Sequence, residues 1–146
     1  MILDMQTLFS DKQAITATGP STNVVDLGAT GTVPRTTTPL VRNVGRGTNI
    51  PLLIQVTEAF TNLTSLTVAI QQAADEAFTS PTTLTTQTVV LADLKPGRRF
   101  AHRIVPDGTS GRYLRLLYTV TGTAPTTGRI TAGMTMGNDE TFPVPL

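Results

Sequence analysis

The chain of 146 residues has no cysteine, no tryptophan, one histidine and only 14% charged residues. Without cysteine there are no disulfides and no thiolate metal sites. A serine-type triad or a zinc site usually needs at least one histidine. The single His102 alternates with Phe100 and Ile104, which predicts that it faces the core of a strand. These absences favour a protein that is not an enzyme and that holds no metal or cofactor.

Long apolar runs and strong net charge are also missing. The N-terminal "MILDMQTLFSDKQAIT" lacks the basic start and the apolar core of a signal peptide, and no apolar run approaches membrane-spanning length. A formal net charge of +1 gives no strong field that would draw the molecule to nucleic acid or to a membrane. We therefore expect a protein that is not secreted, that does not enter a membrane and that does not bind nucleic acid directly.

Threonine takes the place of charge, at about one residue in five, and its β-branched side chain suits the exposed face of a strand. Several segments alternate apolar and polar residues, as half-buried strands do. The shared apolar faces are Ile50, Leu52, Ile54 and Val56; Leu66, Val68 and Ile70; and Ile130, Ala132, Met134 and Met136. Further predicted strands are "STNVVDLG", "TPLVRNV" and "TTQTVVLADL".

Turn signals such as "GRGTN", "PDGTSG" and "GTAPTTG" separate these segments at intervals of about 8–12 residues. This spacing predicts one all-β domain, an antiparallel jelly-roll-like sandwich of about eight strands with extended termini. We expect residues 13–137 to form the domain, residues 1–12 an N-terminal arm and residues 138–146 an extended tail. The arm carries Leu3, Leu8 and Phe9. It could be frayed, pack back on its own domain or lie on a neighbouring subunit.

Positive charge is concentrated in "GRRFAHRIVPDGTSGRYLRLLYTV", residues 97–120, which contains five of the nine arginines. If its two halves pair as a hairpin, one register keeps a face apolar, with Phe100, His102 and Ile104 on the same side as Leu114, Leu116, Tyr118 and Val120. That register predicts Arg99 and Arg103 on the outer face beside Tyr113 and Arg115. Arginine and tyrosine are enriched in protein interfaces, so docking to an acidic partner is one interpretation. Local pairing with Asp93, Asp107 or Glu58 is another, and nucleic acid is the least favoured.

The opening "MILDMQTLFSDKQAITATGPSTNVVDLG" and the later "GRYLRLLYTVTGTAPTTGRITAGMT" resemble the small capsid cement proteins of tailed double-stranded-DNA bacteriophages. The resemblance covers about half of the chain. It implies a jelly-roll-like domain that binds the outer surface of an expanded icosahedral capsid and braces its subunits without doing chemistry. The implied partners are the major capsid protein and further copies of the chain. The implied location is the virion, after synthesis in the host cytoplasm.

The resemblance carries no residue motif, so the candidate interface residues come from the patterns above. They are Arg99, Arg103, Tyr113, Arg115, Leu3, Leu8 and Phe9. A closed homo-oligomer is expected, and a dimer is favoured over a trimer because two-fold dimers are the commonest closed form. The alternative function is a carbohydrate- or receptor-binding jelly roll of a virion. With aromatic residues at 5%, the stacking platform for such a site is thin.

Overall fold

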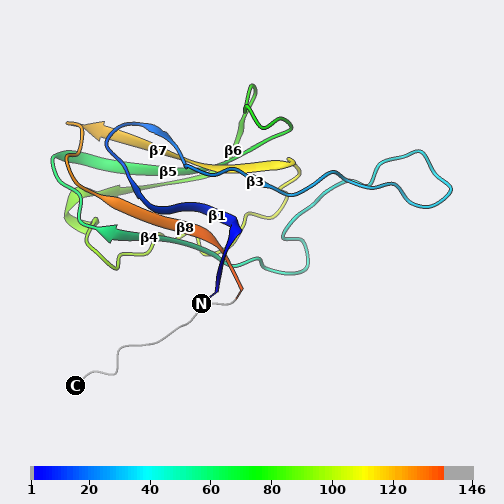
Figure 1. Cartoon of the computed structure of the whole chain (residues 1–146), viewed down its shortest axis with the longest axis horizontal. Coiled ribbons are helices and arrows are strands. Elements are labelled where there is room, and N and C mark those ends of the chain that lie inside the picture. Colours follow the sequence, from blue (N-terminus) through cyan, green and yellow to red (C-terminus); the bar gives the residue numbers. More distant parts are fainter. Residues whose placement is uncertain (1, 137–146) are drawn as a thin grey trace, which may run out of the picture.

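A computed structural model describes residues 2–136, which fold into two antiparallel β-sheets that pack against each other (Figure 1). The predicted all-β sandwich is confirmed. One short 3₁₀ helix, η1, covers Leu91–Asp93. The strands are β1 (Leu3–Ala14), β2 (Gly19–Pro20), β3 (Val25–Asp26), β4 (Leu52–Glu58), β5 (Leu63–Ala73), β6 (Thr82–Val90), β7 (Tyr113–Gly122) and β8 (Arg129–Thr135).

The strand order gives the connectivity of a jelly roll. One sheet has the order β1-β8-β4, and the other has the order β2-β7-β5-β6, with β3 also paired to β7. Residues 97–105 run along the outer edge of β4 as an irregular strand, because Phe100 N donates to Ile54 O at 2.9 Å and Leu52 N donates to Arg103 O at 2.8 Å. With this segment counted, most connections between consecutive strands cross from one sheet to the other, as in a jelly roll.

The predicted apolar faces of the central strands form the core. Leu66, Val68 and Ile70 of β5 are at most 2% exposed, and Leu116 and Tyr118 of β7 are completely buried. The register places Val68 opposite Tyr118 and Ile70 opposite Leu116, so the same faces of both strands point inward. Alternation with a period of two therefore identified the buried side of these strands correctly.

Two other predictions from alternation were wrong. Met136 does not share the buried face of β8 and is 79% exposed, because the strand ends at Thr135. The segment "TPLVRNV", residues 38–44, is not a strand of either sheet. It makes only isolated bridges, at Pro39 and Val44, so Leu40 and Val41 lie outside the core, whereas Val44 packs against it.

The N-terminal segment is a strand and not an arm. β1 pairs with β8, with Leu8 opposite Gly133 and Ser10 opposite Ala132. Leu8 and Phe9 are 5% and 1% exposed, so they pack in the core of their own domain. Their predicted contact with a neighbouring subunit is contradicted by this burial. Leu3 begins the strand and is half-buried, and the predicted tail, residues 138–146, lies outside the described residues.

A buried polar contact connects the two sheets. The Tyr118 hydroxyl of β7 lies 2.8 Å from Ser10 Oγ of β1, and the Ser10 hydroxyl donates to Gln13 Oε1 at 2.6 Å. Burial of the phenol raises the pKa of Tyr118 far above its usual value. The hydroxyl therefore stays protonated, and its hydrogen bond links β1 of one sheet to β7 of the other.

Candidate partner-binding surfaces

The arginine-rich stretch does not form the predicted hairpin. Residues 97–105 lie beside β4 in one sheet, whereas β7 lies between β5 and β2 in the other sheet. The turn "PDGTSG" therefore carries the chain from one sheet to the other. The prediction failed because it assumed that these two consecutive segments pair, which is the commoner arrangement, whereas here the chain crosses to the other sheet between them.

Arg99 and Arg103 remain together, on the segment that covers the edge of β4. Arg99 faces Gln55 across an isolated β-bridge, and both arginines are exposed. Ile104 is also exposed there, at 45%, although its alternation with Phe100 predicted a buried position. Phe100 itself is buried as predicted. The segment thus offers two cations and one apolar side chain on the outside of the sandwich.

Arg115 and Tyr113 lie elsewhere, on β7, and are engaged within the chain. The Arg115 guanidinium lies over the Phe78 ring, 4.1 Å from its centroid, and its Nε donates to Gln71 Oε1 at 2.9 Å. Tyr113 lies under the guanidinium of Arg112 at 4.9 Å. The structure therefore separates the predicted cluster into an exposed pair, Arg99 and Arg103, and a half-buried pair on the other sheet.

Asp26 and Glu58 form ion pairs with two arginines outside the predicted cluster, Arg112 and Arg129. Arg112 donates two hydrogen bonds to the Asp26 carboxylate, at 2.8 and 2.7 Å, and Glu58 accepts one from Arg129 at 2.8 Å. The Arg112 guanidinium, with the backbone N–H of Gly28, lowers the pKa of Asp26 to about 2. The Asp26–Arg112 pair could not be predicted from the sequence, because these residues are far apart in the chain and are brought together only when β3 pairs with β7.

The most prominent feature outside the sandwich is a projecting segment, residues 29–41, which we call the finger. It is the cyan loop that extends away from both sheets in Figure 1. Every residue in it is exposed. Val33, Leu40 and Val41 are 47%, 52% and 90% exposed. These apolar side chains lie outside the core and keep much of their surface in contact with water, which marks the finger as a candidate contact surface.

The finger has its own local order. A β-bridge joins Thr32 to Pro39, and Leu40 N donates to Gly31 O at 2.9 Å. At the tip, Thr36 N donates to Val33 O at 3.1 Å and closes a four-residue turn. These contacts give the segment the shape of a short hairpin although it lies far from the core.

An arginine occupies an unusual position in that turn. Pro34 fixes the first central φ, and Arg35 has a φ of 69° at the second, the pattern of a type II turn. Glycine or asparagine usually fills this site, because a side chain in the left-handed region is strained. Arg35 is the only charged residue of the finger, so the turn holds a single guanidinium at its tip.

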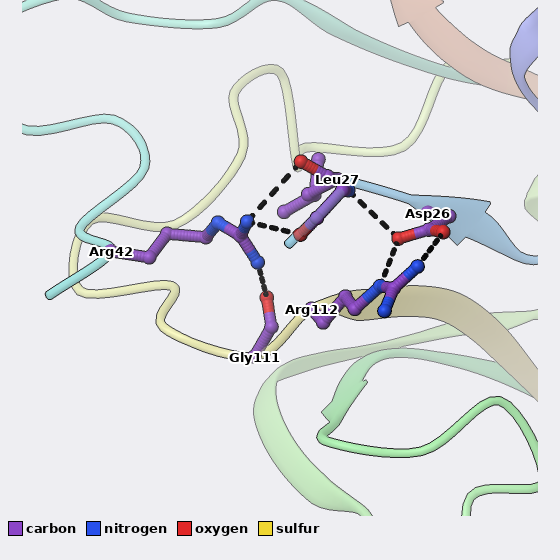
Figure 2. Close-up of polar contacts among 6 residues, drawn as sticks. Asp26, Leu27, Arg42, Gly111 and Arg112 are labelled. Atoms are coloured by element: carbon purple, nitrogen blue, oxygen red, sulfur yellow. Dashed lines mark hydrogen bonds and ion pairs between the residues drawn. The ribbon is translucent and has the colours of Figure 1, made fainter. Parts of the chain in front are cut away.

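The base of the finger is fastened to the sandwich by a second arginine. Figure 2 shows the Arg42 guanidinium directed at three backbone carbonyl groups. It donates to Gly111 O at 3.3 Å, to Leu27 O at 3.2 Å and to Gly28 O. Val44 N, directly beyond, donates to Thr109 O at 2.9 Å. The direction in which the finger projects is therefore set by polar contacts at its base.

Sequence analysis missed the finger, although the chain carries a signal for it. Residues 27–57 contain three arginines and no acidic residue. A stretch without internal ion pairs, with "VPR" as its turn, differs from the mixed charge usual on a solvated surface. Alternation predicted a strand only in residues 38–44, the returning half of the finger and its base.

A shallow apolar hollow lies where β1 begins and β8 ends. Its volume is about 370 Å³, and its walls include Ile2, Ile50, Met134 and Met136. Asp4 is the one charged residue in the lining. Ile2 and Met136 are 65% and 79% exposed, so this end of the sandwich is a second apolar surface.

The described residues bring together no group of histidine, aspartate and glutamate side chains that could hold a metal ion. His102 is half-buried, and within residues 2–136 its Nε2 atom has no hydrogen-bond partner. No helix in that part of the chain is long and apolar enough to cross a membrane. The contact surfaces above are therefore the features from which a function can be argued.

Comparison with known proteins identifies a family for the chain. No curated protein matches the chain. The family model described as Bbp16 matches residues 9–134, which is most of the chain and includes the finger and both sheets. This match supports the phage type of the resemblance seen in the sequence, without specifying a capsid role. The chain belongs to the Bbp16 family.

Proposed function

We propose that this protein is a capsid cement protein, which binds the outer surface of an expanded phage shell and holds neighbouring major capsid protein subunits together without catalysis. The finger is the observation that carries the proposal. It is locally ordered, it is fastened at its base, and within residues 2–136 its apolar side chains, Val33, Leu40 and Val41, are 47–90% exposed. Membership in the Bbp16 family supports the proposal further.

Cement action requires only that the protein bind the mature lattice more tightly than separated or unexpanded subunits. A brace needs a stiff body and at least two separate contacts. The sandwich supplies stiffness through its core and the Ser10–Tyr118 contact between sheets. The finger at one end and the Arg99–Arg103 edge or the apolar hollow elsewhere supply the separate contacts. Many copies with modest individual affinity would then stabilise a shell.

Self-association belongs to the same proposal, with a dimer favoured over a trimer. The outer edge of β6 suits such a contact, because Thr82–Val90 contains no charged residue and no proline. Exposed strand edges without these features tend to pair with another chain. Analytical ultracentrifugation of the free protein measures the oligomeric state directly.

The alternative, a carbohydrate-binding jelly roll, fits the described residues less well. Sugar sites commonly stack the ring on an exposed aromatic side chain. Among residues 2–136, Tyr113 lies under Arg112, and the other aromatic side chains are buried: Phe9, Phe60, Phe78, Phe100 and Tyr118. None of them offers an open aromatic face. Binding in a glycan-array screen, with no binding to shells, would favour this alternative.

Co-sedimentation with shells tests the proposal. The purified protein is mixed with expanded shells that lack it and, in parallel, with unexpanded precursor shells. We expect saturable binding to the expanded shells and little binding to the precursors. Binding to neither would overturn the cement function, and equal binding to both would contradict recognition of the mature lattice.

A further inference from the structure

We infer that the finger, residues 29–41, is the element that docks on the shell, and that its site there is an apolar depression bordered by acidic side chains. This inference rests on the proposed cement function and assigns the binding surface within it. Arg35 at the tip and the apolar side chains of Val33, Leu40 and Val41 are the contacting groups.

The charge of the region indicates an acidic partner. From residue 27 to residue 57 the chain has Arg35, Arg42 and Arg46 and no acid. Arg42 is used at the base of the finger, where its guanidinium binds carbonyl groups. Arg35 is the cation that projects furthest along the finger, and a planar guanidinium binds a carboxylate through two parallel hydrogen bonds.

The strain at Arg35 is a separate observation in favour of docking. Glycine would fit the turn better, since the φ of 69° is unfavourable for a side chain. The tip of the finger lies away from the sandwich (Figure 1), so packing of Arg35 on the sandwich does not offset this strain. Strained residues concentrate at binding and catalytic sites. A docking role accounts for an arginine where the fold itself would favour glycine.

The apolar side chains define the rest of the site. Val41 is 90% exposed and Leu40 is 52% exposed, and the chain turns so that both lie on the returning half of the finger. Protein interfaces bury an apolar centre and keep charged groups at the rim. The finger has this composition, with apolar side chains along its length and one guanidinium at its end.

Three acidic side chains of the described residues are already engaged within the chain. Asp26 is paired with Arg112, and Glu58 is paired with Arg129. Asp75 accepts hydrogen bonds from the backbone N–H and the hydroxyl of Thr79. Asp4 is the one charged residue that lines the apolar hollow, so the hollow of a second copy is the competing site for the finger and is included in the test.

The decisive variant is Arg35→Gly. It removes the guanidinium and relieves the turn, so the thermal midpoint of the free protein should stay the same or rise. Occupancy on expanded shells should fall, with an apparent affinity lower by about ten-fold, as for loss of a charged interface contact. Arg35→Lys keeps the charge and should bind with an intermediate affinity. Val41→Ser should also weaken binding without lowering the thermal midpoint. Arg46→Gln is the matched control, because it removes an exposed arginine outside the finger.

The outcomes separate this inference from the proposed function. If the unaltered protein fails to bind expanded shells, the cement function is wrong and the inference falls with it. If the unaltered protein binds and the Arg35 and Val41 variants bind equally well, the inference alone is overturned. Loss of binding in the Arg99→Glu, Arg103→Glu double variant, with normal binding of the finger variants, would assign docking to the β4 edge. If Asp4→Asn and Arg35→Gly both abolish self-association and leave shell binding unchanged, the finger binds a second copy instead.

Discussion

Val41 in the finger is 90% exposed, whereas Val68 in β5 is completely buried. Both valines stand in segments that alternate apolar and polar residues, so the local pattern does not distinguish them. The difference arises from neighbours distant in sequence. Val68 lies between paired strands, opposite Gln87 of β6 and Tyr118 of β7, whereas the finger pairs only with itself. Alternation thus indicates an extended backbone, and sheet pairing decides whether its apolar face is buried.

The same comparison separates stability from binding. Burial of apolar area stabilises the sandwich, and the finger contributes little to it because its side chains stay in contact with water. A region that is free of the core can be altered without unfolding the protein. The substitutions below test this division, beginning with the largest expected effect.

Valine-to-alanine changes at the two sites give the most direct test. Val68→Ala should lower the free energy of unfolding by about 2–3 kcal/mol, through lost burial and the cavity that remains. Val41→Ala should change it by no more than about 0.5 kcal/mol. Denaturant titration measures both. Similar losses at the two positions would show that the finger packs on the domain in solution.

The contact between the sheets should have the next largest effect. Ser10→Ala leaves the buried Tyr118 hydroxyl without its acceptor, which should cost about 1–2 kcal/mol of unfolding free energy. The double variant with Tyr118→Phe should lose less than the sum of the two single losses, because it leaves no phenol unpaired. Additive losses in this cycle would mean that the two hydroxyls do not interact.

The Arg42 contacts at the base of the finger should affect the local order of residues 29–44 more than the unfolding free energy of the whole protein. Arg42→Met removes the hydrogen bonds to the carbonyls of Leu27, Gly28 and Gly111 and should cost about 1 kcal/mol. Amide hydrogen exchange in residues 29–44 should accelerate, while exchange in β5 and β7 stays slow. Arg42→Lys is the control that keeps the charge but cannot reach all three carbonyls. Unchanged exchange in both variants would show that Arg42 does not order the finger.

The exposed ion pair of Asp26 should give the smallest effect, visible only in acid. The pKa of Asp26 is lowered from 3.8 to about 2 in the folded protein, so the unfolded state binds the proton more readily. The pair therefore stabilises the fold above about pH 4, and this contribution disappears as the pH falls to about 2. Asp26→Asn should flatten that part of the stability curve, and the exposed control Asp93→Asn should not. An unchanged curve in Asp26→Asn would contradict a lowered pKa.

Much of the fold could be predicted from the sequence, because the central strands repeat with a period of two. The buried faces of β4, β5 and β7 were identified correctly, and so were Ile130 and Ala132 of β8. Most partners of the strands could not be predicted, since apart from β5 with β6 the long strands pair with segments that are far apart in the chain. The assumed hairpin of residues 97–120 and the supposed N-terminal arm both failed for this reason.

The candidate surface was predicted only in part. Arg99 and Arg103 are exposed as expected, yet Tyr113 and Arg115 lie on the other sheet. Arg35 escaped notice because its importance depends on a backbone angle, and the identity of a residue does not reveal its φ. The stretch without acids from residue 27 to residue 57 is the sequence feature that would have directed attention to it.

The position of β8 between β1 and β4 has a consequence for how the protein is made. During synthesis β1 emerges first, but β8, its neighbour in the described part of that sheet, is encoded more than a hundred residues later. Until β8 leaves the ribosome, β1 and β4 have no strand between them. The edges that pair with β8 then lack their hydrogen-bond partner, and this sheet is incomplete. Folding of this sheet is therefore expected to follow translation of β8, and to be slow, as is usual where contacts join distant parts of a chain.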